Sequence, residues 1–124
     1  SAVYFNDEPT VHRLVEAGLD VEHANSRGDT PLKIACGRGN LALVKFLRQH
    51  GATTGPHGKR GDTALIRAAR FRKLEIAEYL LRDERVEVDV TNRRGDTALL
   101  EAARAGATKV LLELLDKGAD VKHK

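Results

Sequence analysis

The sequence predicts an all-α fold, a solenoid of stacked helix-turn-helix pairs joined by extended finger loops. The main observation is a six-residue block, 27–32, that returns almost unchanged at 60–65 and 94–99. The steps between copies are 33 and 34 residues, and a fixed period in this range is typical of a stacked repeat. Each block combines a glycine, which suits a tight turn, with a threonine, which is a favoured helix N-cap. The apolar run after each block carries small residues, which allow neighbouring helices to approach closely.

This register divides the single domain into four units, a partial repeat at 1–24 and repeats at 25–57, 58–91 and 92–124. The partial unit is expected to hold a second helix that begins near Asp7-Glu8-Pro9, because an acidic capping residue precedes proline there.

The second unit is the best-preserved copy. Its first helix is expected near 31–38 and its second near 41–50, with breaks at Gly39 and Gly51. In the second helix, apolar residues recur with the spacing of one helix face: Leu41, Val44 and Leu47.

Two residues depart from the framework. Arg72 stands where the other full copies have Gly39 and Gly106, and a non-glycine residue in a left-handed turn costs about 1 kcal/mol. Sequence drift explains this better than a functional insertion. Leu112 stands where the other units have polar residues, although a terminal repeat normally presents a polar outer face. Further repeats, a partner, or an irregular cap are the three explanations of Leu112.

The repeated block resembles the ankyrin repeat, whose pattern is roughly Asp-x-x-Gly-x-Thr-Pro-Leu-His-x-Ala-Ala, then Gly, Val-x-x-Leu-Leu and Gly-Ala. The resemblance covers essentially the whole chain, in three copies that keep one register. It implies an ankyrin-repeat solenoid that binds proteins. The family's histidine is replaced by Lys33, Ile66 and Leu100, so its hydrogen bond to the threonine is not expected here.

Composition indicates a soluble globular chain. The 124 residues are 41% hydrophobic and 31% charged, and the net charge of +3 is too small to indicate a nucleic-acid or membrane protein. No segment is long and apolar enough to span a membrane, and no secretory signal is visible. The single Cys36 suits a reducing compartment, so we expect an intracellular protein, cytoplasmic or nuclear. Its small-residue position predicts a buried, inert thiol rather than a nucleophile.

Catalytic patterns are absent from the sequence. The five histidines recur in no pattern, no paired histidine spacing suggests a zinc hydrolase, and no glycine-rich loop suits a phosphate. We therefore expect a protein that is not an enzyme, without cofactor, metal or catalytic residue. The triplet Arg-Gly-Asp also matches an adhesion-receptor tripeptide, but here it leads directly into a helix cap. Asparagine hydroxylation, known in the family, is not carried over, because the matching positions hold Glu22, Gly55 and Asp89.

The resemblance implies a binding groove between the finger tips and the exposed side of the first helices. The matching positions are rich in arginine, which together with aromatic residues is enriched at binding hot spots. The predicted partner-binding residues are Arg27, Asp29, Arg38, Lys59, Arg60, Asp62, Arg70, Phe71, Arg93, Arg94, Asp96 and Arg104. The competing interpretation is that the finger arginines pair with nearby aspartates on an ordinary solvated surface.

The first functional hypothesis is a non-enzymatic scaffold or regulatory module that binds a protein or a linear peptide of acidic character. Finger arginines 27, 60 and 94 would form a ladder with rungs about 8–10 Å apart, and Phe71 would supply an apolar anchor. The alternative is a polyanion binder that uses these arginines for nucleic acid or an inositol phosphate. A designed binder is disfavoured because the framework varies between copies.

Overall fold

The computed structural model describes residues 9, 13, 15–18, 20–22, 28–55, 61–83 and 86–118. Six helices are assigned in these ranges: α2 (Pro31–Arg38), α3 (Leu41–Gln49), α4 (Ala64–Arg70), α5 (Leu74–Leu81), α6 (Ala98–Ala105) and α7 (Thr108–Asp116). Apart from an isolated bridge residue, Asp62, no described residue is in a β-strand. The predicted all-α class is confirmed. In the partial first unit, the described residues 9, 13, 15 and 16 are helical.

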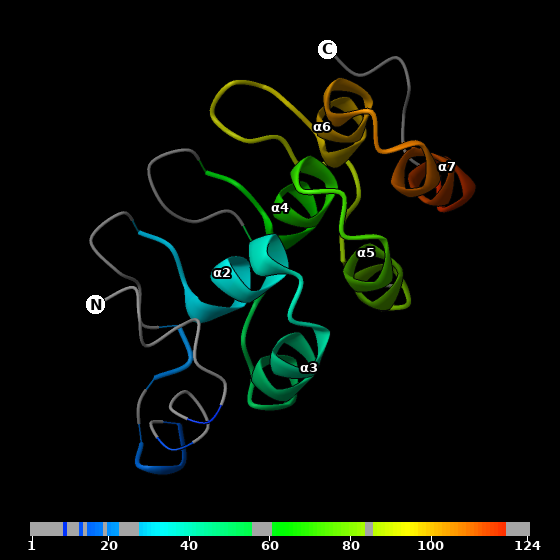
Figure 1. Ribbon diagram of the computed structural model, residues 1–124. Coiled ribbons are helices and arrows are strands. Elements are labelled where there is room, and N and C mark those ends of the chain that lie inside the picture. The colour runs from blue at the N-terminus through cyan, green and yellow to red at the C-terminus, as the bar shows by residue number, and fades with distance from the viewer. Residues whose placement is uncertain are drawn as a thin grey trace.

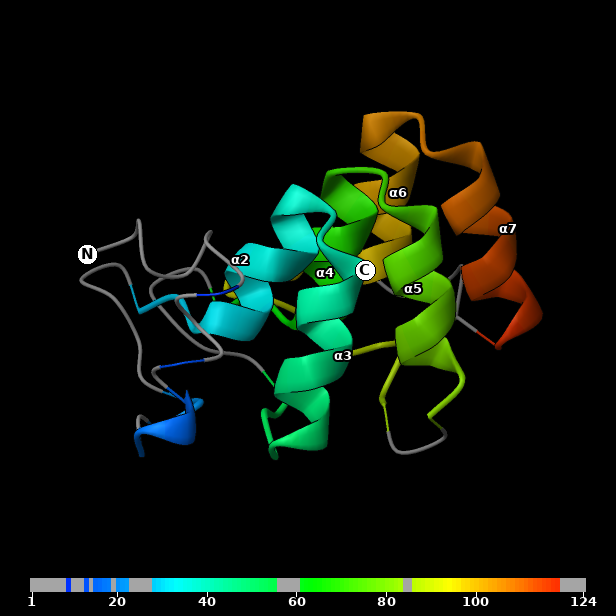
Figure 2. The ribbon, with the colours of Figure 1, turned by 60° about the horizontal axis from the view of Figure 1, so that its bottom comes forward.

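The helices form two layers. The first helix of each pair, α2, α4 and α6, lies in an inner layer, and the second helices, α3, α5 and α7, lie in an outer layer (Figures 1 and 2). Contacts run between successive helices of each layer and within each pair, and this is the pattern of a stacked array. The loop 86–97 projects beyond the inner layer before it enters α6 (Figure 1).

Threonine caps begin two of the three inner helices as predicted. Thr63 Oγ1 accepts a hydrogen bond from the Ile66 amide at 3.1 Å, and Thr97 Oγ1 accepts one from the Leu100 amide at 3.3 Å. Thr30 makes no such bond, and α2 instead begins with Pro31, which needs no amide partner at the first helical position.

The turns between paired helices require left-handed backbone. Gly39 and Gly106 have φ of 83° and 69°, and Arg72, at the matching place, has φ of 59°. Among the described residues Arg72 is the one non-glycine residue with positive φ. The predicted turn strain at Arg72 is therefore present in the structure.

Leucine, isoleucine and alanine side chains fill the space between the layers. The small residues of α2 and α4 are buried, whereas Ala103 of α6 is exposed. Cys36 is fully buried, and burial raises the pKa of its thiol to about 12. A thiol with this pKa is protonated at neutral pH, as expected for an inert side chain. Leu112, on α7, is 59% exposed.

Candidate functional site

The inner layer and the loops that enter it carry nine of the twelve predicted binding residues within the described ranges. The other three, Arg27, Lys59 and Arg60, lie outside the described residues, so the arginine ladder stays a prediction. The nine divide into a buried group and an exposed group. Asp62 and Asp96 are buried, and Asp29 and Arg70 are partly buried; Phe71 and the remaining arginines belong to the exposed group.

Each aspartate that follows a finger glycine is held by an arginine. Asp62 is completely buried and accepts hydrogen bonds from Arg70 at 3.0 and 3.2 Å. Asp96 is also buried and accepts one from Arg104 at 2.7 Å. Both arginines come eight residues after their aspartate, so one local geometry recurs in two repeats. Asp62 and Asp96 are therefore held in internal ion pairs.

Arg70 is fixed on both sides of its guanidinium. In addition to Asp62, it donates to Glu101 of the next repeat at 3.3 and 3.1 Å. Burial opposes its charge, but the hydrogen bonds to Glu101 and Asp62 outweigh burial and raise the pKa of Arg70. Glu101 was not among the predicted residues. The available signal was its place within an otherwise apolar stretch of an inner helix, where the earlier repeats have Ile34 and Arg67.

Asn92 connects two successive repeats. Its Nδ2 donates to Asp62 at 3.0 Å, and its Oδ1 accepts from the amides of Arg94 and Asp96, both at 3.0 Å. Burial alone would raise the pKa of Asp62, but hydrogen bonds from Arg70 and Asn92, together with the Arg70 charge, lower it to about 2. Through Asn92, the turn that precedes α6 is thus hydrogen-bonded to the Asp62 carboxylate of the preceding repeat.

In the repeat 25–57, the aspartate is paired with an arginine from a different helix. Gly37 occupies the position that Arg70 and Arg104 occupy in the next two copies, so α2 offers no arginine to Asp29. The cation comes instead from the following repeat, where Arg67 donates to Asp29 at 2.5 Å and to Asp62 at 3.2 Å. A continuous row of charge pairs results, and we call it the ion-pair row. It consists of Asp29, Arg67, Asp62, Arg70 and Glu101.

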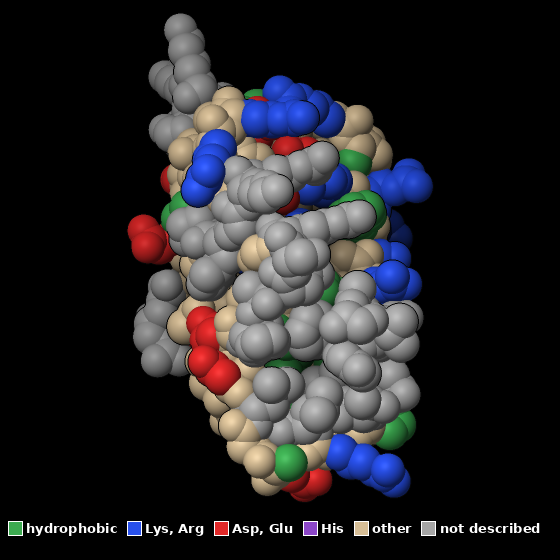
Figure 3. All heavy atoms as spheres, turned by 90° about the vertical axis from the view of Figure 1, so that its left-hand side faces the viewer, with side chains coloured by type: hydrophobic (Ala, Val, Ile, Leu, Met, Phe, Trp, Pro, Cys, Tyr) green, Lys and Arg blue, Asp and Glu red, His purple; other side chains and the backbone are tan. Residues whose placement is uncertain are grey.

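Exposed cations surround one exposed aromatic residue on this layer. Phe71 is 49% exposed at the end of α4, and Arg38 and Arg72 are exposed beside the turns that end α2 and α4. In the described part of the chain, the side chains of Arg38, Arg72 and Arg94 take part in no ion pair. Figure 3, viewed from the finger side, shows Lys and Arg side chains gathered at one end and along one edge.

Arg93 and Arg104 are exposed but have packed or paired side chains. The stem of Arg93 lies across the finger turn at Gly61, where an added Cβ would be 3.2 Å from Arg93 Cγ. The Arg104 side chain remains 59% exposed while it holds Asp96. Helix arginines, rather than the described finger arginines, therefore form the pairs with aspartate.

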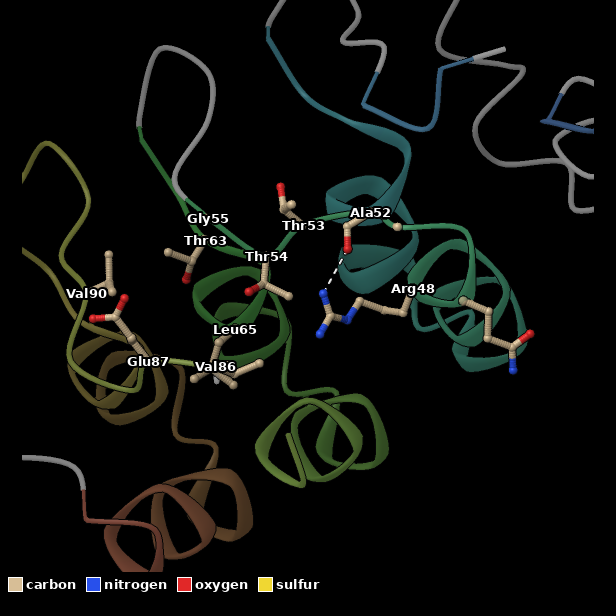
Figure 4. Close-up of a pocket in the computed structure, with 12 residues that line it drawn as sticks. Arg48, Ala52, Thr53, Thr54, Gly55, Thr63, Leu65, Val86, Glu87 and Val90 are labelled. Carbon is tan, nitrogen blue, oxygen red and sulfur yellow. Dashed lines mark hydrogen bonds between the residues drawn. The ribbon is translucent and has the colours of Figure 1, made fainter. Parts of the chain in front are cut away.

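A concavity of about 560 Å³ lies between the segments 51–55 and 86–90 (Figure 4). Threonine side chains, Leu65 and Val86 line it together with Arg48. The Arg48 guanidinium is already bound, because it donates to the Ala52 carbonyl at 2.8 Å and to Asp83 at 2.6 Å. The carboxylate of Glu87 also belongs to the lining. Within the described ranges, no group of three or more His, Cys, Asp or Glu side chains could hold a metal ion.

A two-layered array of stacked helix pairs is the architecture of a helical repeat protein. Comparison with protein families identifies the array. The chain belongs to the ankyrin-repeat family, since the family model described as "Ankyrin repeats (3 copies)" matches residues 1–92 and 55–124. Members of this family are typically not catalytic and bind other proteins.

Curated relatives share part of the array. Ankyrin repeat domain-containing protein 13B of Mus musculus is 36% identical over 81 residues, covering 64% of this chain and 13% of the relative. NF-kappa-B inhibitor alpha of Sus scrofa is 37% identical over 86 residues, covering 64% of this chain and 27% of the relative. The chain thus spans a minor part of the length of these relatives. Among the described residues, no helix has the length and apolar character needed to cross a membrane.

Proposed function

We propose that this chain is a protein-interaction module that binds an acidic linear segment of a partner along the inner layer. The observation that carries the proposal is the unequal exposure of opposite charges there. Asp62, Asp96 and Glu101 are buried against arginines, whereas Arg38, Arg72 and Arg94 are exposed. The surface offered to a partner is therefore cationic, although the whole chain carries a net charge of only +3.

Affinity for a peptide needs more than exposed charge pairs, which contribute about 0–1 kcal/mol each. Phe71 supplies apolar area in the midst of the cations, and such aromatic residues are enriched at interface hot spots. The family assignment supports protein binding in general, and one relative is named as an inhibitor of another protein, NF-kappa-B. An intracellular setting, cytoplasmic or nuclear, remains a prediction, consistent with the buried thiol of Cys36.

The test compares charge reversal on and off the inner layer. Immobilised wild-type chain, an Arg38→Glu, Arg72→Glu double variant and an Arg82→Glu, Lys109→Glu control are each titrated with labelled glutamate-rich peptides of about 12 residues. A peptide of this length spans about 40 Å, enough to cross three inner helices spaced about 8–10 Å apart. The double variant should lose most of the binding, and the control, whose residues are exposed on α7 and at the end of α5, should keep it. Equal loss in both variants would refute a site on the inner layer.

Ionic strength separates the proposal from polyanion binding. Contacts dominated by phosphates weaken steeply with salt, because each neutralised phosphate releases a condensed counterion. Single-stranded nucleic acid and inositol hexakisphosphate therefore serve as competitors in the same titration. If either binds more tightly than the acidic peptides and loses its affinity steeply with salt, the polyanion function replaces the proposed one.

A further inference from the structure

The inner layer presents an uneven surface to a bound segment. At one position of the repeat, α4 and α6 carry Arg70 and Arg104, and α2 carries Gly37. The ring of Phe71 lies beside this glycine: a Cβ added at Gly37 would be 3.4 Å from both Cδ2 and Cε2 of the ring. The glycine thus lets the Phe71 ring lie against the α2 backbone, at the place that a side chain at position 37 would occupy. We call this place, formed by the Gly37 backbone and the exposed Phe71 ring, the Gly37 step.

The Gly37 step is apolar, whereas its surroundings are cationic. Phe71 is the one large hydrophobic residue exposed on the described part of the inner layer, since Leu112 and Leu115 belong to α7. Arg38 directly follows Gly37, and Arg72 directly follows Phe71, so an exposed cation adjoins both parts of the step. Neither arginine is held in an ion pair within the described ranges.

An arginine is not needed at Gly37 to satisfy the buried charges. The carboxylate of Asp29 is already paired with Arg67 of the next repeat at 2.5 Å. In the following repeat, Arg70 is required, because it bridges Asp62 and Glu101. Because α4 brings Arg67, a cation, to α2, position 37 needs no arginine, and the Phe71 ring packs against it instead.

We propose that the Gly37 step sets the specificity of the inner layer: one aliphatic side chain of an acidic linear peptide packs against the exposed part of the Phe71 ring. This inference rests on the proposed function and adds the position and the chemistry of the anchor. Carboxylates on either side of the anchor meet Arg38 and Arg72. The combination favours a hydrophobic residue flanked by acidic residues over a uniformly charged chain. Burying a leucine rather than an alanine at a half-exposed ring increases affinity about tenfold.

The test uses two labelled peptides of about 12 residues, rich in glutamate, that differ only in a central leucine or alanine. The protein variants are Gly37→Arg, which copies the residue found in α4 and α6, and Gly37→Ala. Folding should be retained in both, because Gly37 lies in a helix, has no positive φ, and arginine and alanine are better helix formers than glycine. Thermal unfolding of each variant checks this directly.

The wild-type chain should bind the leucine peptide about tenfold more tightly than the alanine peptide, measured by fluorescence anisotropy. Gly37→Arg should abolish this preference while binding of the alanine peptide is kept, and Gly37→Ala should retain most of the preference. Equal binding of both peptides by the wild-type chain would overturn the inference and leave the proposed function standing. Failure of the wild-type chain to bind either peptide would count against the proposed function itself.

Discussion

Lys33 is a buried amine at the position where the ankyrin pattern has histidine. It is 0% exposed, and among the described residues its Nζ and the Thr30 hydroxyl are the two buried side-chain atoms without a hydrogen-bond partner. Burial lowers the pKa of Lys33 from 10.5 to about 8, helped by the Arg67 charge and opposed by nearby carboxylates. The folded state therefore holds an ammonium that water would solvate better, and removal of this charge should stabilise the fold.

The proposed perturbation is Lys33→Met, which keeps an unbranched side chain of similar volume without the charge. A shift from 10.5 to about 8 at about 1.4 kcal/mol per unit corresponds to about 3 kcal/mol. Below pH 8 the lysine is protonated in both the folded and the unfolded state, so the variant should gain this whole amount. For a small domain a change of this size is a large part of the total stability.

The sign of the pH dependence gives a second readout. Because the pKa is lower in the folded state, the unfolded chain binds more protons between pH 8 and 10.5. Wild-type stability should rise by about 1.4 kcal/mol per pH unit across this window, and it should fall again as the pH drops to 8. Lys33→Met lacks this rise, so the advantage of the variant should disappear near pH 10.5.

Urea unfolding followed by circular dichroism, between pH 6 and pH 10.5, measures both effects as the difference between variant and wild type. Lys109→Met, an exposed substitution on α7, is the matched control and should change stability by less than about 0.5 kcal/mol. A Lys33→Met variant that is no more stable than wild type at pH 7, or whose advantage persists unchanged at pH 10.5, would refute the reasoning.

Three further predictions concern the strained turn at Arg72, the loss of stability in acid through Asp62, and self-association through the exposed Leu112. Arg72→Gly should stabilise the chain by about 1 kcal/mol, because it relieves a φ of 59°, whereas Arg82→Gly, at a φ of −70°, should not; urea unfolding distinguishes them. Asp62, with a folded pKa of about 2, should contribute stability above its unfolded pKa of about 3.8 and lose it as the pH falls through 2. Asp62→Asn should remove this acid limb from a stability-versus-pH profile. Leu112→Lys should reduce self-association at high concentration in light scattering, and a wild-type chain that stays monomeric, with no change in the variant, would contradict this.

Local signals in the sequence were enough to predict the helices. The span of α2 was predicted at its observed bounds, and α3 ends one residue earlier than expected, because the Thr-Pro start and the glycine stop act within a few residues. The repeat boundaries and the binding residues remain predictions. Caps and turns depend on residues only a few positions apart, so they can be predicted without knowing how the neighbouring repeat packs.

The pairing within the candidate site could not be predicted in the same way. Asp62, Asp96 and Arg70 were predicted to face a partner, but the structure shows the two aspartates buried and Arg70 bridging Asp62 to Glu101. Glu101 lies 31 residues from Arg70, so its role depends on the contact between α4 and α6. Burial of Lys33 likewise depends on what packs over α2, and the sequence alone indicated only that the usual histidine was missing.

The ion-pair row also encodes the order of the repeats. Where α4 packs on α2, Arg67 of α4 pairs with Asp29, and α2 itself carries Gly37 rather than an arginine. Where α6 packs on α4, Glu101 of α6 pairs with Arg70 of α4. If α4 and α6 were exchanged, Arg67 would meet Arg104, and Glu101 would meet Asp29 with no cation between them. Either mismatch would place like charges together in place of an ion pair. Units that look alike in sequence are therefore not interchangeable, because the ion-pair row favours the observed order of neighbours.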